Sequence, residues 1–463
     1  MKNPPLKTAS YLTIALFVVL IVSGCIADEE SAAPPISWDT AKIINNNIAQ
    51  FASGKQEYDV AFYGKGEAIV VWLQSEIIFT SRYSPNSGWE TPEVVTENVS
   101  TENFLDIHFK KNQKPEVAVD KEGNAIVVWV SNIPKYDYPT GITYTFRTYA
   151  RRLNIEGDWG NEEEISSNSG NTAIPKIAMD SMGNASVTWF QGNCGCGNIV
   201  QSIYYDTNLG WGQTKVINFA TNQQYSQSPD DLLFDLNDKA FLVGGTRYSQ
   251  MDENFNWETS KTISTEMSEF SEVSLSMDGN GNIFAIWKAL IPRLSTSAVQ
   301  ILSSRFEPGV GWSENDILNA GRDRVVSSDP RIATNKNGDA VAIWRQKDNV
   351  DKAIFHEARI ARFIAGEGWQ QSKSLAKLDK DLLTADVAID SEGNIAAIWN
   401  TSSKMFSRQY VKDVGWSSST LVYEEENETI SGLSVEIDNM NNFVIFWQLG
   451  SDLFSSNVVN NKN

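Results

Sequence analysis

Residues able to do nucleophilic, redox or metal chemistry are few in this chain. Its 463 residues include three cysteines and two histidines. Cys194 and Cys196 stand in the stretch GNCGCGN, and outside the cytoplasm such a pair tends to oxidise to a strained, reducible disulfide. The pair could be a disulfide that pins the loop, two free thiols, or a redox or soft-metal site. A metal site would have few further ligands, because Cys25 is the only other cysteine.

Neither histidine stands in a catalytic pattern. His108 and His356 are far apart, and no HExxH or Ser-His-Asp arrangement surrounds them, so we expect packing or surface roles. Arginines could bind a carboxylate, but four of them each lie seven residues before a tryptophan: Arg82, Arg152, Arg305 and Arg362. This fixed spacing predicts four separate positions around a repeat structure, not one arginine cluster.

Acidic, glycine-containing stretches raise the question of calcium. The stretch DGNGN at 278–282 is the most calcium-like of them, but it lacks the full ligand set of an EF-hand. The related stretches replace its aspartate with Tyr63 or Asn335 and its glycine with Asp238 or Asn441. Asp, Gly and Asn are also the residues that turns prefer, so we expect structural turns and no metal site, with calcium the alternative.

These stretches belong to a repeat that runs through the chain. Its pattern is an apolar alternation, Asp, two variable residues, Gly-Asn, an apolar run, and Trp nine residues after the Asp, as in DSEGNIAAIW at 390–399. Seven copies end in tryptophan, and a degenerate copy covers 235–244. The seven tryptophans are Trp72, Trp129, Trp189, Trp287, Trp344, Trp399 and Trp447.

A second motif, a strand followed by a turn and Gly-Trp or a relative, follows each of the first seven copies. Its tryptophans are Trp89, Trp159, Trp211, Trp257, Trp312, Trp369 and Trp416. Trp38 completes the chain's 15 tryptophans and supplies the piece that the last copy lacks. Four antiparallel strands per repeat predict an all-β fold, a single eight-bladed β-propeller closed by the N-terminal strand 37–46, with seven blades as the alternative. The tryptophans are then expected to pack the blades.

The repeat resembles two bacterial propeller families. Asp-x-x-Gly-Asn after an apolar strand is similar to the NHL repeat. Similarity to the sialidase-like BNR proteins is poorer, because their Asp-box places Asp and Trp five residues apart in a different hairpin, whereas here the spacing is nine. Both resemblances imply architecture and neither implies an activity.

The N-terminus has the features of an export signal. Lys2 and Lys7 precede the apolar run 11–22, which is too short to span a membrane. VSGC at 22–25 resembles the lipobox of bacterial lipoproteins, which implies cleavage and acylation of Cys25. We therefore expect a signal peptide at 1–24, a flexible tether at 25–36 and the propeller at 37–463, with repeats from about 58 to 459. Ile26 favours the outer membrane, if the source has one.

Net charge −20 disfavours nucleic acid as a partner. Propeller ligands are expected on the face that carries the non-repeating loops, and three stretches depart from the repeat: 101–114, 131–141 with Tyr136 and Tyr138, and 192–198. The resulting hypothesis is a monomeric, lipid-anchored envelope module that binds a protein or a glycan and has no cofactor. The alternative is an envelope polysaccharide hydrolase or lyase.

Overall fold

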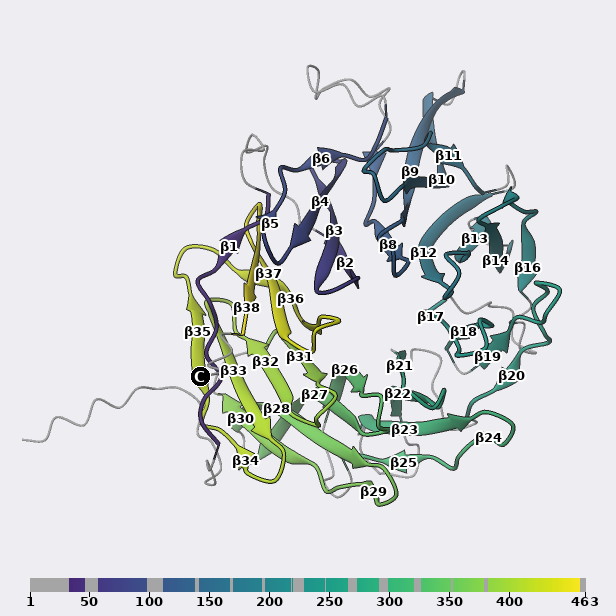
Figure 1. Ribbon diagram of the computed structural model, residues 1–463. Helices are drawn as coiled ribbons and strands as arrows, with labels where there is room; N and C mark the ends of the chain where they lie inside the picture. Colours follow the sequence, from purple (N-terminus) through teal and green to yellow (C-terminus); the bar gives the residue numbers. More distant parts are fainter. Residues whose placement is uncertain are drawn as a thin grey trace, which may run out of the picture.

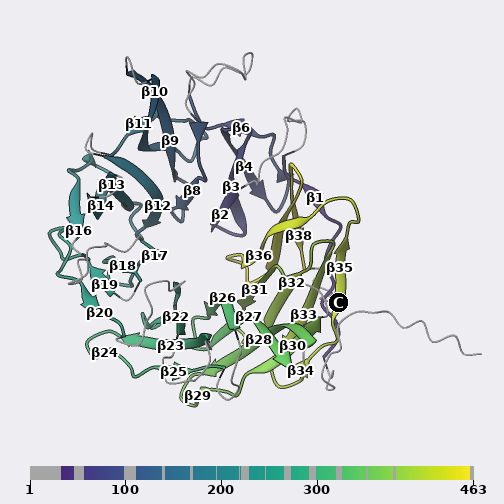
Figure 2. The same cartoon turned by 180° about the vertical axis from the view of Figure 1, so that it is seen from behind.

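The computed structural model consists of β-strands connected by turns. It describes residues 33–45, 57–97, 111–137, 141–166, 170–193, 196–217, 219, 229–245, 247–264, 273–290, 299–319, 326–350, 353–378 and 382–458. Within these ranges there is no helix, and therefore none long and apolar enough to cross a membrane. The protein is all-β, and its antiparallel sheets stand side by side in a β-propeller-like ring (Figures 1 and 2).

Each repeat contributes an inner strand that lies near the centre of the ring (Figure 1). The inner strands are β2 (Glu57–Tyr63), β8 (Glu116–Val119), β12 (Asn171–Met179), β17 (Asp231–Phe234), β21 (Val273–Met277), β26 (Val326–Thr334), β31 (Thr384–Ile389) and β36 (Ile430–Ile437). A short strand β7 (Lys111–Asn112) precedes β8 and also pairs with the strand next to it, β9.

The second strand of each repeat pairs antiparallel with its inner strand. These strands are β3 (Glu67–Gln74), β9 (Ala125–Asp137), β13 (Ala185–Asn193), β18 (Ala240–Gly244), β22 (Ile283–Leu290), β27 (Ala340–Val350), β32 (Ile395–Asn400) and β37 (Phe443–Leu449). The third strands are β4 (Ile77–Ser84), β10 (Gly141–Leu153), β14 (Cys196–Asp206), β19 (Arg247–Gln250), β23 (Val299–Glu307), β28 (Ala353–Ile364), β33 (Lys404–Val411) and β38 (Asp452–Asn457).

Short strands complete the outside of the ring. Gly-Trp pairs form β5 (Gly88–Trp89), β15 (Gly210–Trp211), β24 (Gly311–Trp312), β29 (Gly368–Trp369) and β34 (Gly415–Trp416). The outer strands are β1 (Lys42–Ile43), β6 (Glu93–Val94), β11 (Glu163–Glu164), β16 (Lys215–Ile217), β20 (Lys261–Thr262), β25 (Asp316–Ile317), β30 (Lys373–Leu378) and β35 (Thr420–Glu424).

The sheets are separate hydrogen-bonded units with one exception. A single parallel pair, Val299 with Val326, joins two neighbouring units into one ten-stranded sheet. The N-terminal strand β1 pairs antiparallel with β38, so the beginning and the end of the chain share a sheet. Trp38 extends this pairing through a bridge to Val458.

The core consists of apolar layers between neighbouring sheets. All seven tryptophans that end the second strands are at most 1% exposed. Each packs against the second strand of the preceding unit; Trp399, for example, shares a cluster with Val341 and Ile343. Trp72 packs in the same way against Val444 and Phe446 from the end of the chain. Packing therefore joins the last unit to the first, whereas the pairing of β1 with β38 lies within the last unit's own sheet.

Candidate functional site at the centre of the ring

Of the ligand-face candidates predicted from sequence, only Tyr136 and Cys196 lie within the described residues, so a site formed by these candidates stays a prediction. Cys25, His108, Tyr138 and Cys194 lie outside the described residues. Tyr136 lies within β9 opposite Ile142 of β10. Cys196 begins β14, where it pairs with Asn193. His356 is half-buried in β28, opposite Lys347 of β27.

The aromatic stretch 131–141 differs from the loop that the sequence suggested. Strand β9 continues to Asp137 and β10 begins at Gly141, so most of this stretch is a long β-hairpin. The alternating pattern of the preceding apolar run continues only weakly here, which is why the extension was not expected. Backbone pairing, rather than side-chain pattern, extends the two strands.

The four arginines that each lie seven residues before a tryptophan are on four separate third strands and have four different partners. Arg82 pairs with Glu90 at 3.1 Å. Arg152 stacks over the Tyr205 ring, and Arg362 stacks over the Tyr410 ring. Arg305 lies 3.9 Å from a carboxylate oxygen of Asp278. They are packing and turn residues of four repeats, and no carboxylate-binding cluster forms from them.

The Asp-x-x-Gly-Asn stretches form turns that are stabilised by their own side chains. In DSEGN, Asp390 Oδ1 accepts the backbone N–H of Glu392 and Asn394 at 2.9 and 2.7 Å, and Asp390 Oδ2 accepts the Asn394 side-chain amide at 2.8 Å. Asn394 Oδ1 in turn accepts the backbone N–H of Lys412 at 3.0 Å, which connects this turn to the one that follows the third strand. The repeated Asp and Asn residues thus make the hydrogen bonds that stabilise the turns.

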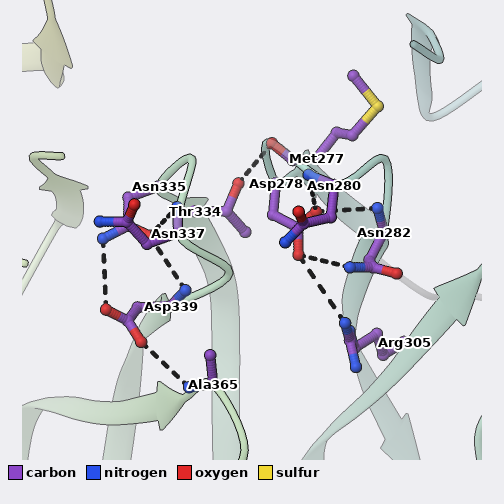
Figure 3. Close-up of polar contacts among 10 residues, drawn as sticks. All are labelled: Met277, Asp278, Asn280, Asn282, Arg305, Thr334, Asn335, Asn337, Asp339 and Ala365. Atoms are coloured by element: carbon purple, nitrogen blue, oxygen red, sulfur yellow. Dashed lines mark hydrogen bonds and ion pairs between the residues drawn. The ribbon is translucent and has the colours of Figure 1, made fainter.

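Figure 3 shows two neighbouring turns, including the most calcium-like one. Asp278 accepts the N–H groups of Asn280 and Asn282, the Asn282 amide, and a contact from Arg305. Its oxygens therefore face donors, whereas a calcium ion needs several free oxygens. Among the described residues, no group of three or more His, Cys, Asp or Glu side chains is arranged to hold a metal ion.

A second position of the repeat carries ionisable side chains on the inner strands. It lies four residues before the Asp of each turn, about 13 Å along the inner strand. We call its occupants the inner ring: Asp59, Glu116, Lys176, Asp231, Ser274, Arg331, Asp386 and Ser434. Six of these eight are charged although the strands around them are largely apolar.

Three aspartates of the inner ring join neighbouring inner strands. Asp59 accepts the N–H of Val117 at 2.8 Å, Asp231 that of Leu275 at 3.1 Å, and Asp386 that of Val435 at 2.9 Å. Each inner strand would otherwise present unpaired backbone N–H groups to the centre, because its neighbour belongs to another sheet. The aspartates satisfy some of these groups.

The inner ring also contains ion pairs. Lys176 Nζ lies 2.9 Å from Glu116 Oε1, and Lys114 approaches the same oxygen at 3.4 Å. Arg331 is exposed and interacts electrostatically with Asp386 and Glu436. Cations and carboxylates therefore alternate over part of the ring.

Glu436 lies on an inner strand but outside the inner ring. It lies two residues before its turn, where most other repeats have a small residue, including Ala61, Ala118 and Ala388. Desolvation, followed by the charges of Asp386 and Asp59, raises the pKa of Glu436 to about 8. Glu436 is therefore predominantly protonated at neutral pH, which suits a proton donor.

The pKa values of Asp59 and Asp386 are shifted in the same direction. Desolvation, and then the charge of Glu116, raises the pKa of Asp59 to about 6. Desolvation also raises the pKa of Asp386, while Arg331 opposes the rise. Near neutral pH, Asp59 is therefore mostly ionised while Glu436 keeps its proton. Neighbouring carboxyl groups with separated pKa values are the usual arrangement for paired acid and base roles.

Tyr58 connects the first inner strand with the last. Its hydroxyl lies 2.5 Å from the Gly432 carbonyl, to which it donates, and 2.8 Å from Ser434 Oγ. Gly432 has a φ of 57° at a register shift of β36, and a Cβ there would lie 3.2 Å from Tyr58 Cε1. Desolvation raises the pKa of Tyr58, so this phenol stays neutral. We call Tyr58, Asp59, Arg331, Asp386 and Glu436 the axial site.

The sequence contains a signal for the axial site outside the repeat motif. Positions in phase with the repeat are expected to be structural, and the residue four positions before each turn varies among Asp, Glu, Lys, Arg and Ser. Only the ring brings these positions to one place. The substitution of Glu436 into an otherwise small-residue position was the most specific indication.

Comparison with known proteins gives similarity at the level of structure only. No protein-family model matches the chain, and no curated protein matches it. A polysaccharide lyase described as a PL25 ulvan lyase, bound to -[GlcA(1-4)Rha3S]-, superposes with a TM-score of 0.48 at 12% identity, covering 94% of this chain and 95% of that chain.

Two other solved structures are glycoside-cleaving enzymes. The NanB sialidase from Streptococcus pneumoniae has a TM-score of 0.41 at 9% identity, covering 92% of this chain and 71% of that chain. An α-L-arabinofuranosidase from Fusarium graminearum has a TM-score of 0.39 at 11% identity, covering 74% of this chain and 92% of that chain. At these values the activity must be argued from the chain's own residues.

Proposed function

We propose that the chain is an eight-bladed β-propeller of the cell envelope that hydrolyses a polysaccharide at the axial site. The observation that carries this proposal is the pair Glu436 and Asp59 on the neighbouring inner strands β36 and β2. One carboxyl group keeps its proton near neutral pH and the other is mostly ionised. Hydrolysis of a glycosidic bond needs such a proton donor with a carboxylate base or nucleophile.

Hydrolysis is favoured over elimination by the state of Tyr58. A lyase needs a base that removes a proton next to a uronate carboxylate, and tyrosine can supply one only when its pKa is lowered. Here desolvation raises the pKa of Tyr58, and its hydroxyl is engaged with Gly432 and Ser434. Arg331, exposed beside Asp386, supports binding of a polar or acidic sugar.

A binding module without catalysis is the second candidate. The hydrogen bonds from Asp59, Asp231 and Asp386 to neighbouring backbones favour it, because they give these carboxylates a structural use. In that case the ring would hold a glycan or a protein partner at its loop-rich face.

The proposed location is the cell envelope, with the chain anchored to a lipid membrane, and to the outer membrane if the source has one. It rests on the lipobox-like sequence VSGC and the apolar run before it. Acylation of Cys25 would anchor the mature chain, since two or three acyl chains hold a protein stably on a bilayer.

The activity test uses the variant Glu436→Gln, which keeps the shape of the side chain and removes the proton donor. We expect wild-type protein to release new reducing ends from at least one envelope polysaccharide, and Glu436→Gln to be roughly 10²- to 10⁴-fold slower. Glu392→Gln, at an exposed turn position, is the matched control.

The result also separates the alternatives. Equal activity of Glu436→Gln and wild type would refute the assignment of Glu436. Products with the ultraviolet absorbance of an unsaturated uronate would indicate a lyase instead. Binding of a glycan with no cleavage by wild-type protein would support the binding module.

A further inference from the structure

One end of the ring carries the turns between inner and second strands and the turns that follow the third strands. The turns between inner and second strands lie beside the turns that follow the third strands, and hydrogen bonds connect them. Asn184 Oδ1 accepts the N–H of Thr207 at 2.9 Å, and Asp339 Oδ1 accepts that of Ala365 at 3.0 Å. We call this end the turn face. The connections between second and third strands, such as the one at Ser402, lie at the opposite end.

The turn face bears the most exposed large apolar side chains of the described residues. Leu209 is 87% exposed, Val310 is 79% exposed and Met182 is 66% exposed, and each occupies the tip of a turn. Ile155, Leu236, Phe255, Val414 and Met440 are further exposed apolar residues of these turns. Turn tips normally carry polar residues, so this concentration at one end indicates a contact surface.

Part of this apolar set is continuous. Leu209 and Phe255 line one pocket of about 210 Å³ together with Trp211, between the third and fourth units. The Phe255 ring stacks on that of Tyr204 with centroids 4.2 Å apart. The next turns along the ring approach each other as well, because Leu236 lies against Gly281. These contacts join turns of the third, fourth and fifth units.

The N-terminal segment reaches the ring at the turn face. The backbone N–H of Ala33 donates to the carbonyl of Trp416 at 3.4 Å. Trp416 directly follows a turn whose tip is the exposed Val414. Cys25 lies eight positions before Ala33, which allows at most about 28 Å when extended and about 16 Å on average in a flexible chain. An acylated Cys25 would therefore hold the turn face close to the membrane.

We infer that the turn face rests on the lipid bilayer, with Leu209, Val310 and Met182 in contact with lipid. This inference rests on the proposed acylation of Cys25. A net charge of −20 disfavours a strongly anionic surface, so the fitting partner is a bilayer rich in zwitterionic lipid, into which apolar tips insert. The opposite end of the ring, where the inner strands begin, then faces away from the membrane.

The test measures the distance of single probes from lipid in the full, lipidated chain. Cys194→Ser and Cys196→Ser remove the other thiols, and a fluorophore is attached at Leu209→Cys or Val310→Cys. The matched control is Ser402→Cys, exposed at the opposite end. In phosphatidylcholine vesicles with nitroxide-labelled lipid, we expect quenching at positions 209 and 310 to be at least about threefold stronger than at 402.

The outcomes are distinct. Mass spectrometry of the mature N-terminal peptide first establishes whether Cys25 carries acyl chains; an unmodified Cys25 would overturn both the anchor and the orientation. An acylated Cys25 with equal quenching at the three positions would overturn only the orientation. Protection of position 209 in a dimer of the unanchored chain, without lipid quenching, would assign the apolar surface to a second copy and also overturn the inference.

Discussion

At the scale of single residues, the same side-chain types have two different uses in this protein. Aspartates of the turns, such as Asp390, are saturated by nearby N–H donors. Carboxyl groups near the centre of the ring have fewer donors and more like-charged neighbours, and the pKa of Glu436 rises accordingly. The difference arises from position, since burial near other carboxylates disfavours ionisation whereas several donors favour it.

The raised pKa of Glu436 predicts a dependence of stability on pH. Its folded pKa is about 8, and an unfolded glutamate titrates near 4.3, so between these values the folded state binds a proton that the unfolded state lacks. Stability is therefore greatest below this window and falls as pH rises through it, by at most about 1.4 kcal/mol per pH unit from this group.

Urea unfolding between about pH 5 and about pH 8 measures this effect. Glu436→Gln should flatten the decline, although Asp59, whose pKa is also raised, to about 6, keeps part of it. Glu392→Gln should follow the wild-type curve. A Glu436→Gln curve parallel to wild type would show that Glu436 does not keep its proton in the folded state.

At the scale of strands and hairpins, the repeat hairpin is a packing unit. Its turn is fixed by Asp and Asn hydrogen bonds, and its second strand ends in a tryptophan buried against the preceding unit. The fourth unit shows how far the pattern tolerates change. Gly244 replaces the tryptophan, and its layer is filled instead by residues such as Phe219, Leu242 and Met251.

Trp399→Ala is expected to destabilise the fold by about 3–5 kcal/mol, because it leaves a cavity between two sheets. Trp399 is 0% exposed and packs with Val341, Ile343 and Leu375. Chemical denaturation of Trp399→Ala and the milder Trp399→Phe provides the measurement. Glycan binding per folded molecule should be unchanged, and wild-type stability of Trp399→Ala would contradict the packing role.

At the scale of the whole molecule, the N-terminal segment completes the last unit. Trp38 Nε1 donates to Ser407 Oγ at 2.9 Å, and Trp89 and Trp257 make the equivalent bond to Ser455 and Ser202 of their preceding units. Trp38 therefore occupies the second tryptophan position of the last repeat. Strand β1 covers the edge of β38, which would otherwise be free to pair with other chains.

Neighbouring isoleucines test this closure. Ile44 is 1% exposed and packs with Trp72 and Leu453, whereas Ile43 is 41% exposed. Ile44→Ala is expected to lower the free energy of unfolding by about 2–5 kcal/mol, while Ile43→Ala should change it by no more than about 0.5 kcal/mol. Similar effects of the two variants in denaturant unfolding would indicate that the N-terminal segment does not close the ring.

The sequence by itself determined the local parts of this protein. The Asp-x-x-Gly-Asn turns and the strand that ends in a buried tryptophan follow from residues within a few positions of each other, where turn chemistry and strand periodicity act. The place of Trp38 follows from the count of repeats along the whole chain. The all-β class follows from their repetition. The long hairpin at 131–141 shows the limit, because backbone pairing extended it without a side-chain pattern.

Only the tertiary structure decided where the chemistry lies. Glu436 is far from Tyr58 and Asp59 in the sequence, and it becomes their neighbour because the last inner strand stands beside the first. Their pKa values depend on desolvation and on charges from other strands, which no local pattern contains. The apolar turn tips were likewise visible as single residues, and only the ring gathers them on the face where the N-terminal segment arrives.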